Sequence, residues 1–452
     1  MEVTPAPNGG FGWIVVFAAF MQHVLSLGVA YTLGIYYKPF LEVFPVLPST
    51  AAWVAALHLG ILFGIGPVAG WLMGKIGTSG VSFAGSLIAG LGCIGAAFAT
   101  SIYVVIVCLG LISGIGTGFM FISSVTAVSR WFDTRRALAT GLAVSGAGFG
   151  IFLFAPLVRL MLSHYGREGA LLIEGGLAFQ GCVFALLLRP LPRRSLRPVA
   201  YAAKKSSLTL QLREDRPNKL AIFDDEQEES IPLGAARRFS ITENGDVPQP
   251  RTEKKQNMGD IVRNWMFWVF GFSQFLTFLS ASGPLVFLYN RAVNDLSVEV
   301  MQAAYIISIM GIANTAGRLV FGALGNIFPR SRLFLLSGAI MTYGLATAIS
   351  TLGTSFVSVA LYAVVFGAGY GCMFALTTVV LVDHFGIELF GPIYGNIGIF
   401  RGFACIIGPP FAGWLISVTG ANHTILFILK GSLGFCGGAA LLLIPIVKRI
   451  RS

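Results

Sequence analysis

Twelve apolar runs, each about 20 residues long, are the feature that most restricts the fold of this chain. A run of that length can cross the hydrocarbon core of a bilayer as one α-helix. Hydrophobic residues form 55% of the sequence, charged residues only 11%, and the mean hydropathy is +0.78. Soluble domains carry about 25% charged residues. The sequence therefore predicts an all-α membrane protein with twelve transmembrane helices, over residues 12–37, 50–73, 79–99, 103–128, 137–162, 169–188, 264–290, 300–325, 331–351, 355–381, 392–417 and 423–447.

The formal net charge of +11 suggests nucleic acid as a partner, but the positions of the basic residues argue against it. Of the 31 Lys and Arg residues, 24 lie in the even-numbered loops between the runs or in the C-terminal tail. This asymmetry follows the positive-inside rule and predicts that both termini lie in the cytoplasm. We therefore expect a multi-pass protein of the plasma membrane, surrounded by lipid, with no role in binding nucleic acid.

A long polar stretch, residues 189–262, separates the first six runs from the last six. Its low hydrophobicity and mixed charge predict a largely disordered cytoplasmic linker between bundles at 1–188 and 263–452. The two parts also repeat one another. Residues 66–77 align with 317–330 at an offset of 252, and residues 165–177 align with 419–433 at an offset of 254. Two six-helix halves in parallel repeat are typical of the major facilitator fold, which has its substrate site between the halves.

Arg318 lies inside the almost wholly apolar stretch I-I-S-I-M-G-I-A-N-T-A-G-R-L-V-F-G-A-L-G. A permanent cation at membrane depth costs about 2.5–3.5 kcal/mol on insertion scales, and helix packing gives no reason to accept that cost. A cation that faces a cavity can hold an anionic substrate. The repeat aligns Arg318 with Gly66 and Arg401 with Ala147, so the fold does not require a cation at either position.

Three segments resemble the monocarboxylate porter family of the major facilitator superfamily. They are N-G-G-F-G-W at 8–13, R-W-F-D-T-R-R-A-L-A-T-G-L-A-V-S-G at 130–146, and I-I-G-P-P-F-A-G-W-L at 406–415. The first has Asn8 where that family usually has an acid. Together with the six-plus-six layout, the resemblance covers nearly the whole chain outside the linker.

The resemblance implies roles for three residues. Lys38 matches the family's lysine at the outer end of helix one, and Arg318 matches the arginine of its Asp-x-x-x-Arg pair in helix eight. Asn314 occupies the position of the aspartate in that pair. Asn314 can hydrogen-bond a substrate but cannot titrate, so a carboxylate-based proton relay is in doubt while the anion site is kept. Asn314 and Arg318 are four residues apart and face one side of a helix.

Two further residues are candidates for the substrate site. Tyr370, within F-G-A-G-Y-G-C, is the best placed of several tyrosines and histidines that could line a cavity. Arg401 is either part of the site or a structural tie to Glu174 or to a helix carbonyl. The sequence contains no cluster with metal-ligand spacing and no nucleophile–base arrangement. We therefore expect no metal, no cofactor and no enzymatic activity.

The leading interpretation is a secondary active or facilitative transporter of small organic anions, above all monocarboxylates, working by alternating access. One alternative is a relative that moves a larger vitamin-like or amino-acid substrate, and another is a membrane sensor that moves nothing. Protons are a candidate co-substrate. Lys38 then either binds the proton together with the anion or acts as a fixed attractant during exchange or facilitated diffusion. The sequence leaves open the substrate and any accessory membrane subunit.

Overall fold

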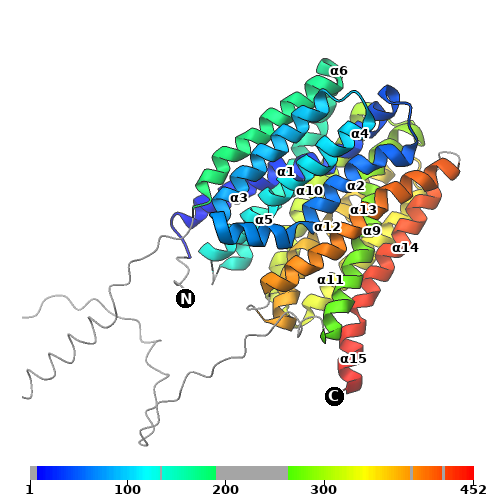
Figure 1. The fold of residues 1–452 in the computed structure, drawn as a ribbon. Helices are drawn as coiled ribbons and strands as arrows, with labels where there is room; N and C mark the ends of the chain where they lie inside the picture. The colour runs from blue at the N-terminus through cyan, green and yellow to red at the C-terminus, as the bar shows by residue number, and fades with distance from the viewer. Residues whose placement is uncertain (1–7, 133–134, 190–262, 387–389, 420–422, 452) are drawn as a thin grey trace, which may run out of the picture. The chain divides into compact units, whose positions relative to one another are not determined.

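The computed structural model describes residues 8–132, 135–189, 263–386, 390–419 and 423–451, all within one compact unit (Figure 1). Every regular element in these ranges is helical and none is a strand, which confirms the predicted all-α class. Residues 190–262, which form nearly all of the predicted linker, lie outside the described ranges.

The first part of the chain, up to residue 189, consists of six α-helices and one π-helix. Their bounds are α1 Gly12–Val43, α2 Pro48–Gly64, α3 Gly66–Ala97, α4 Ile102–Val105, the π-helix η1 Ile106–Ile112, α5 Ser113–Trp131 and α6 Arg136–Leu187. The helices α4, η1 and α5 follow one another without a loop, so they form one continuous helical segment.

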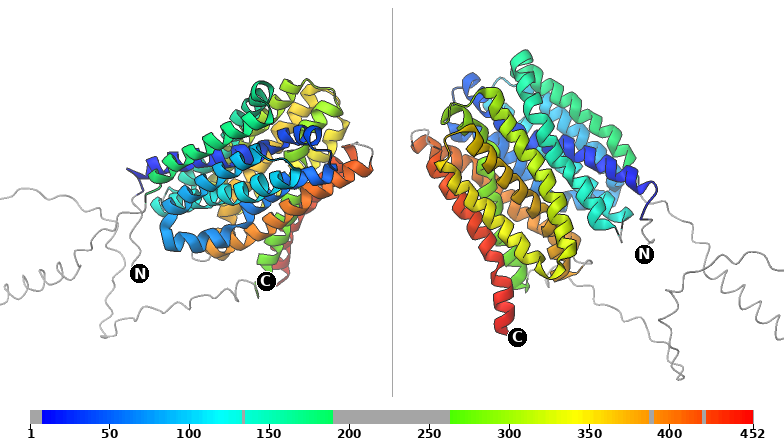
Figure 2. Two further views of the ribbon diagram at one scale, coloured as in Figure 1. Left: turned by 45° about the horizontal axis from the view of Figure 1, so that its top comes forward. Right: turned by 180° about the vertical axis from the view of Figure 1, so that it is seen from behind.

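The second part begins at residue 263 and contains seven α-helices and two short 3₁₀ helices. Their bounds are α9 Trp265–Asn294, α10 Val300–Ile327, η2 Pro329–Ser331, α11 Arg332–Ile349, η3 Ser350–Leu352, α12 Phe356–Phe385, α13 Phe390–Val418, α14 Thr424–Leu441 and α15 Leu443–Arg451. Figure 2 shows α14 and α15 following one another toward the C-terminus.

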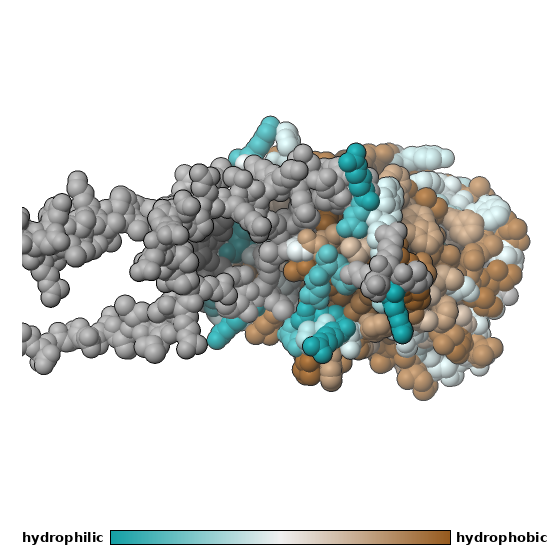
Figure 3. All heavy atoms as spheres, turned by 90° about the horizontal axis from the view of Figure 1, so that it is seen from below, coloured by the Kyte–Doolittle hydropathy of each residue, from teal (hydrophilic) through white to brown (hydrophobic). Residues whose placement is uncertain are grey.

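Ten helical segments within the described ranges are long and apolar enough to cross a membrane. Large apolar side chains cover much of their outer surface, with Trp71 60% exposed, Phe98 70% and Val357 72%. In Figure 3, hydrophilic side chains stand beside broad apolar areas. A soluble protein rarely exposes so much contiguous apolar surface. Lipid around these helices would keep this apolar surface out of water. The chain is therefore an integral multi-pass membrane protein.

Two of the long helices contain a break at a glycine. Gly77 interrupts α3 with φ 76°, and Gly166 interrupts α6 with φ 66°. Both values lie in the left-handed region, which glycine adopts without the steric penalty of a Cβ atom. The breaks fall between apolar runs that the sequence separated, at residues 73–79 and 162–169.

Glycines bring helices from the two parts of the chain into close contact. A Cβ atom on Gly148 of α6 would lie 2.5 Å from the carbonyl oxygen of Gly311 in α10. A Cβ atom on Gly34 of α1 would lie 2.5 Å from the carbonyl oxygen of Val286 in α9. Such contacts require small residues, because helices in lipid associate through close packing and not through the hydrophobic effect.

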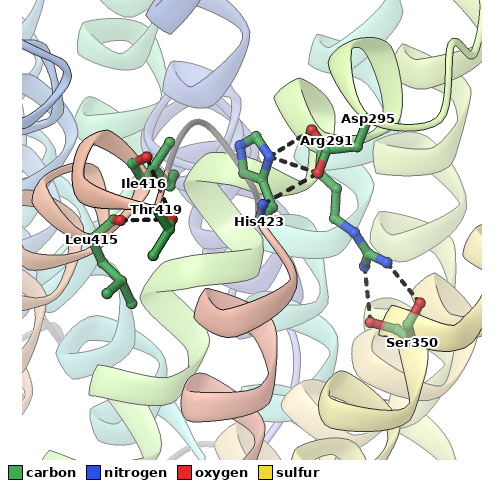
Figure 4. Close-up of polar contacts among 7 residues, drawn as sticks. All are labelled: Arg291, Asp295, Ser350, Leu415, Ile416, Thr419 and His423. Carbon is green, nitrogen blue, oxygen red and sulfur yellow. Dashed lines mark hydrogen bonds and ion pairs between the residues drawn. The ribbon is translucent and has the colours of Figure 1, made fainter.

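A polar cluster ties α9 to its neighbours near the C-terminal end of that helix (Figure 4). Arg291 donates hydrogen bonds to the hydroxyl of Ser350 at 3.0 Å and to its carbonyl oxygen at 2.7 Å. His423, just before α14, places Nδ1 2.8 Å from Asp295. Burial lowers the pKa of His423 below its ordinary value, although Asp295 acts in the opposite direction. His423 and Asp295 thereby join the segment before α14 to the end of α9.

Candidate functional site

Arg318 is buried, with 2% of its surface exposed, and reaches from α10 to α6. Its Nε donates to Oδ1 of Asn314 at 2.9 Å, and its Nη1 donates to the carbonyl oxygen of Val144 at 2.8 Å. Its Nη2 is buried and has no hydrogen-bond partner among the described residues. A buried N–H without a partner costs about 1–3 kcal/mol. The Arg318 guanidinium therefore has one donor group free to bind a ligand.

Asn314 is held by both of its amide atoms. Its Oδ1 accepts from Arg318, and its Nδ2 lies 3.4 Å from the carbonyl oxygen of Gly367 in α12. Gly371, one turn further along α12, packs against the Asn314 carbonyl oxygen so closely that a Cβ atom would overlap it. This contact between α10 and α12 fixes the helix backbone that carries Asn314 and Arg318.

Tyr370 of α12 meets a tyrosine from the first part of the chain. Its hydroxyl lies 3.1 Å from the hydroxyl of Tyr31 on α1, and its ring stacks on Phe366. Both tyrosines lie within electrostatic reach of Arg318. The structure thus brings three of the predicted residues, Arg318, Asn314 and Tyr370, into one buried region.

Arg401 of α13 is also buried and enters the same region. Its Nε donates to Oε1 of Gln274 in α9 at 2.9 Å. Its guanidinium carbon lies 4.9 Å from the ring centroid of Tyr394 and 5.3 Å from that of Phe278. The alternative of a tie to Glu174 is wrong, because Arg401 bonds to Gln274 and no ion pair joins it to Glu174 among the described residues.

One aromatic ring connects the two arginines. The guanidinium carbon of Arg318 lies 4.6 Å from the Phe374 ring centroid, and that of Arg401 lies 6.0 Å from it. Each distance is within the range of a cation–π contact. Sequence reasoning missed both Phe374 and Gln274. The polar Gln274 within an apolar run was a usable signal, whereas a phenylalanine in such a run carries none.

A cavity of about 320 Å³ lies beside these residues. Phe63, Phe121 and Arg130 line it from the first part of the chain, and Tyr394 and Arg401 line it from the second. Arg130 is exposed and lies in the last turn of α5. The cavity therefore extends from this helix end to the buried Arg401. Its volume is in the range of about 300–1,000 Å³ that is common for small-molecule pockets.

Lys38 is placed differently from the other predicted residues. It lies two turns beyond Tyr31 on α1, its side chain is 50% exposed, and its Nζ is 4.0 Å from Glu42. The structure does not place Lys38 among the contacts of Arg318 or Arg401.

Lys430 is a buried basic residue whose side-chain donors are all used within the protein. Its Nζ donates to the carbonyl oxygen of Leu279 at 2.8 Å, to the hydroxyl of Ser282 at 3.1 Å and to the carbonyl oxygen of Gly408 at 3.3 Å. Three acceptors match the three donors of an ammonium group. Lys430 thereby joins α14 to α9 and α13. The donors of Arg318 are not all used in this way.

These features define a class of protein: a helical, multi-pass membrane protein with a buried cationic site beside a cavity lined by both parts of the chain. The chain belongs to the Major Facilitator Superfamily, whose family model matches residues 12–409 and 270–451. The predicted superfamily is thereby confirmed.

Curated relatives extend over almost the full length of the chain. Monocarboxylate transporter 3 of Gallus gallus is 29% identical over 94% of this chain and 76% of the relative. Monocarboxylate transporter 2 of Homo sapiens is 27% identical over 92% of this chain and 82% of the relative. Monocarboxylate transporter 14 of Mus musculus is 28% identical over 99% and 92%. The resemblance to monocarboxylate porters that the three motifs indicated is confirmed.

Proposed function

We propose that this chain is a secondary transporter of small organic anions, with monocarboxylates as its first substrate class, and not an enzyme. The observation that carries the proposal is Arg318, a buried guanidinium that has no carboxylate partner and one unbound donor among the residues the structure describes. A carboxylate is planar and accepts two hydrogen bonds from such a group. The relatives named as monocarboxylate transporters support the same substrate class.

We also propose twelve crossings arranged as two halves, residues 8–189 and 263–451. The breaks at Gly77 and Gly166 each divide one long helix into two crossings, and α2 with the start of α3 forms one of them. In this arrangement both termini lie on the cytoplasmic side of the plasma membrane, as the distribution of basic residues predicts.

Transport would proceed by alternating access between these halves. At one end, α1 and α9 are closed against each other, with Nδ2 of Asn290 donating to the carbonyl oxygen of Gly34 at 3.1 Å and Tyr37 against Phe287. Toward the other end, the cavity extends to Arg130. Contact at one end and a cavity toward the other support a conformation that is accessible from one side of the membrane.

The test is uptake of labelled pyruvate and lactate into vesicles that contain the purified protein. Wild type should show saturable uptake. Arg318→Gln should abolish it, because the glutamine amide is neutral and lacks the paired N–H donors of the guanidinium group. Arg330→Gln is the matched control, since Arg330 is an exposed arginine just beyond α10. Normal uptake by Arg318→Gln would remove Arg318 from the site.

A further inference from the structure

Two buried arginines share one region without an acidic counterpart. Arg318 and Arg401 contact the same Phe374 ring, and neither is ion-paired within the described residues. Their protein partners are neutral: an asparagine, a glutamine, a backbone carbonyl oxygen and aromatic rings. A monocarboxylate bound at Arg318 would balance one of the two positive charges. The second charge has no balancing group in the described structure.

The side chains around Arg401 also keep unused donors. Within the described structure, Arg401 donates a hydrogen bond only through Nε. Its terminal nitrogens, Nη1 and Nη2, donate none there. This side chain lines the cavity. The amide Nε2 of its partner Gln274 is buried and likewise has no hydrogen-bond partner. Arg401 of α13 therefore faces the cavity, and the unused Nε2 donor of Gln274 on α9 lies on the side chain that holds it.

A purely structural role for Arg401 does not account for this arrangement. Lys430, on the neighbouring α14, uses its ammonium group on three protein acceptors. Arg401 donates one hydrogen bond, from Nε to Gln274. Its two terminal nitrogens, which are well placed to bind a planar carboxylate, stay unbound among the described residues. The aromatic rings of Phe278, Phe374 and Tyr394 stabilise its charge through cation–π contacts but accept none of its N–H groups in the plane of the fork.

We propose that Arg401 and Gln274 form a second anion subsite, and that an organic anion with a second carboxylate at the far end of a short apolar spacer binds more tightly than the corresponding monocarboxylate. One carboxylate would bind Arg318 and the other Arg401, with the spacer against Phe374. Arg401 lines the cavity of about 320 Å³, whereas Arg318 and Phe374 lie behind it, so the carboxylate at Arg318 would have to enter beyond the cavity wall. The inference rests on the proposed transport function and narrows the substrate within it.

The experiment compares acids of matched shape, terephthalate with 4-methylbenzoate and glutarate with pentanoate, as competitors of labelled pyruvate uptake. Wild type should bind each diacid about ten-fold or more tightly than its monoacid, because a charge-assisted hydrogen bond contributes about that factor. Arg401→Gln should bring the ratio close to one, and Arg401→Lys should restore part of it. The ratio does not depend on how much overall uptake a variant retains. Arg330→Gln should keep the wild-type ratio.

Thermal stabilisation of the purified wild-type protein by the same four acids provides a measurement that needs no variant. Greater stabilisation by the diacids supports the second subsite. Equal binding of each diacid and its monoacid overturns it but leaves the transport proposal standing. If neither pyruvate nor any of the acids binds or is taken up, the proposed function itself fails. An unchanged ratio in Arg401→Gln would also overturn the assignment of the subsite to Arg401.

Discussion

Arg318 of α10 donates a hydrogen bond to the backbone carbonyl oxygen of Val144 in α6, at 2.8 Å. The candidate anion-binding group is therefore also a contact between the two parts of the chain. An anion that draws Nη1 away from this carbonyl oxygen would weaken that contact. In the proposed mechanism, substrate binding and movement of the halves would therefore be connected through one guanidinium group.

Replacement of Arg318 by lysine separates charge from geometry. Lysine keeps the positive charge but carries all its donors on one nitrogen. It therefore cannot bind Asn314, Val144 and a planar carboxylate at the same time, as the guanidinium group of Arg318 can. We expect Arg318→Lys to raise the KM for pyruvate by about ten-fold or more. Initial rates of uptake against concentration measure this change. A wild-type KM would mean that the site needs only a point charge.

The glycine contact between α6 and α10 should be sensitive to a single methyl group. In Gly148→Ala the new Cβ would meet the carbonyl oxygen of Gly311 at 2.5 Å, which we expect to cost about 1–3 kcal/mol of stability. Gly141→Ala on the same helix is the matched control, because its Cβ meets nothing within 4 Å. This control should be neutral or stabilising by about 0.5–1 kcal/mol. Thermal unfolding in detergent distinguishes the two, and equal midpoints would contradict the close contact.

Lys430→Met tests the tie between α14, α9 and α13. The substitution keeps the length of the side chain but leaves the carbonyl oxygens of Leu279 and Gly408 without this donor. Each buried acceptor without a partner costs about 1–3 kcal/mol, so the unfolding midpoint should fall clearly. The KM of the folded fraction should stay at the wild-type value. A large change in KM with an unchanged midpoint would instead place Lys430 in the substrate site.

Lys38→Arg distinguishes the two roles considered for Lys38. A proton carrier must be enclosed with the anion, but the Lys38 side chain is 50% exposed and lies near Glu42. We therefore expect Lys38→Arg to leave unchanged the ratio of uptake rates measured in mildly acidic and in neutral external solution. A wild-type ratio above one that falls to one in Lys38→Arg would show that the lysine carries the proton.

His423 should make stability depend on pH. Burial lowers its pKa in the folded protein, so below the ordinary value of 6.5 the unfolded chain binds a proton that the folded chain does not. The contribution of His423 is therefore complete above pH 6.5 and is lost as the pH falls from there toward the lowered pKa. The unfolding midpoint should decline over that window, and His423→Gln should make the decline shallower. An equally steep decline in His423→Gln would assign it to other groups.

The sequence was sufficient to identify the helical class and the buried cations, because a charge within an apolar run is conspicuous. Arg318 was found in this way, whereas Asn314 was found through the family resemblance. Their spacing of four residues predicted that they share one side of a helix, and there they form a hydrogen bond. The breaks at Gly77 and Gly166 also fall where the apolar runs were separated. These properties depend on local composition, which a sequence records directly.

Contacts between distant helices could not be obtained in the same way. The chain has 37 phenylalanines, so nothing local distinguishes Phe374 as the ring between two arginines. The partner of Arg401 was misjudged because an acid, Glu174, was a more obvious counterpart than an amide on α9. The π-helix at Ile106–Ile112 was also missed, since its apolar pattern differs little from that of an α-helix.

The Phe374 ring lies within contact distance of both guanidinium groups, so the free energies attached to Arg318 and Arg401 are not independent. Loss of one cation changes the position and the polarisation of the ring that remains for the other. In a double-mutant cycle the two substitutions should therefore deviate from additivity, and the deviation should disappear in a background where leucine replaces Phe374. An evolutionary change of substrate in a protein built like this would then have to alter the two arginines together, or the ring before either of them.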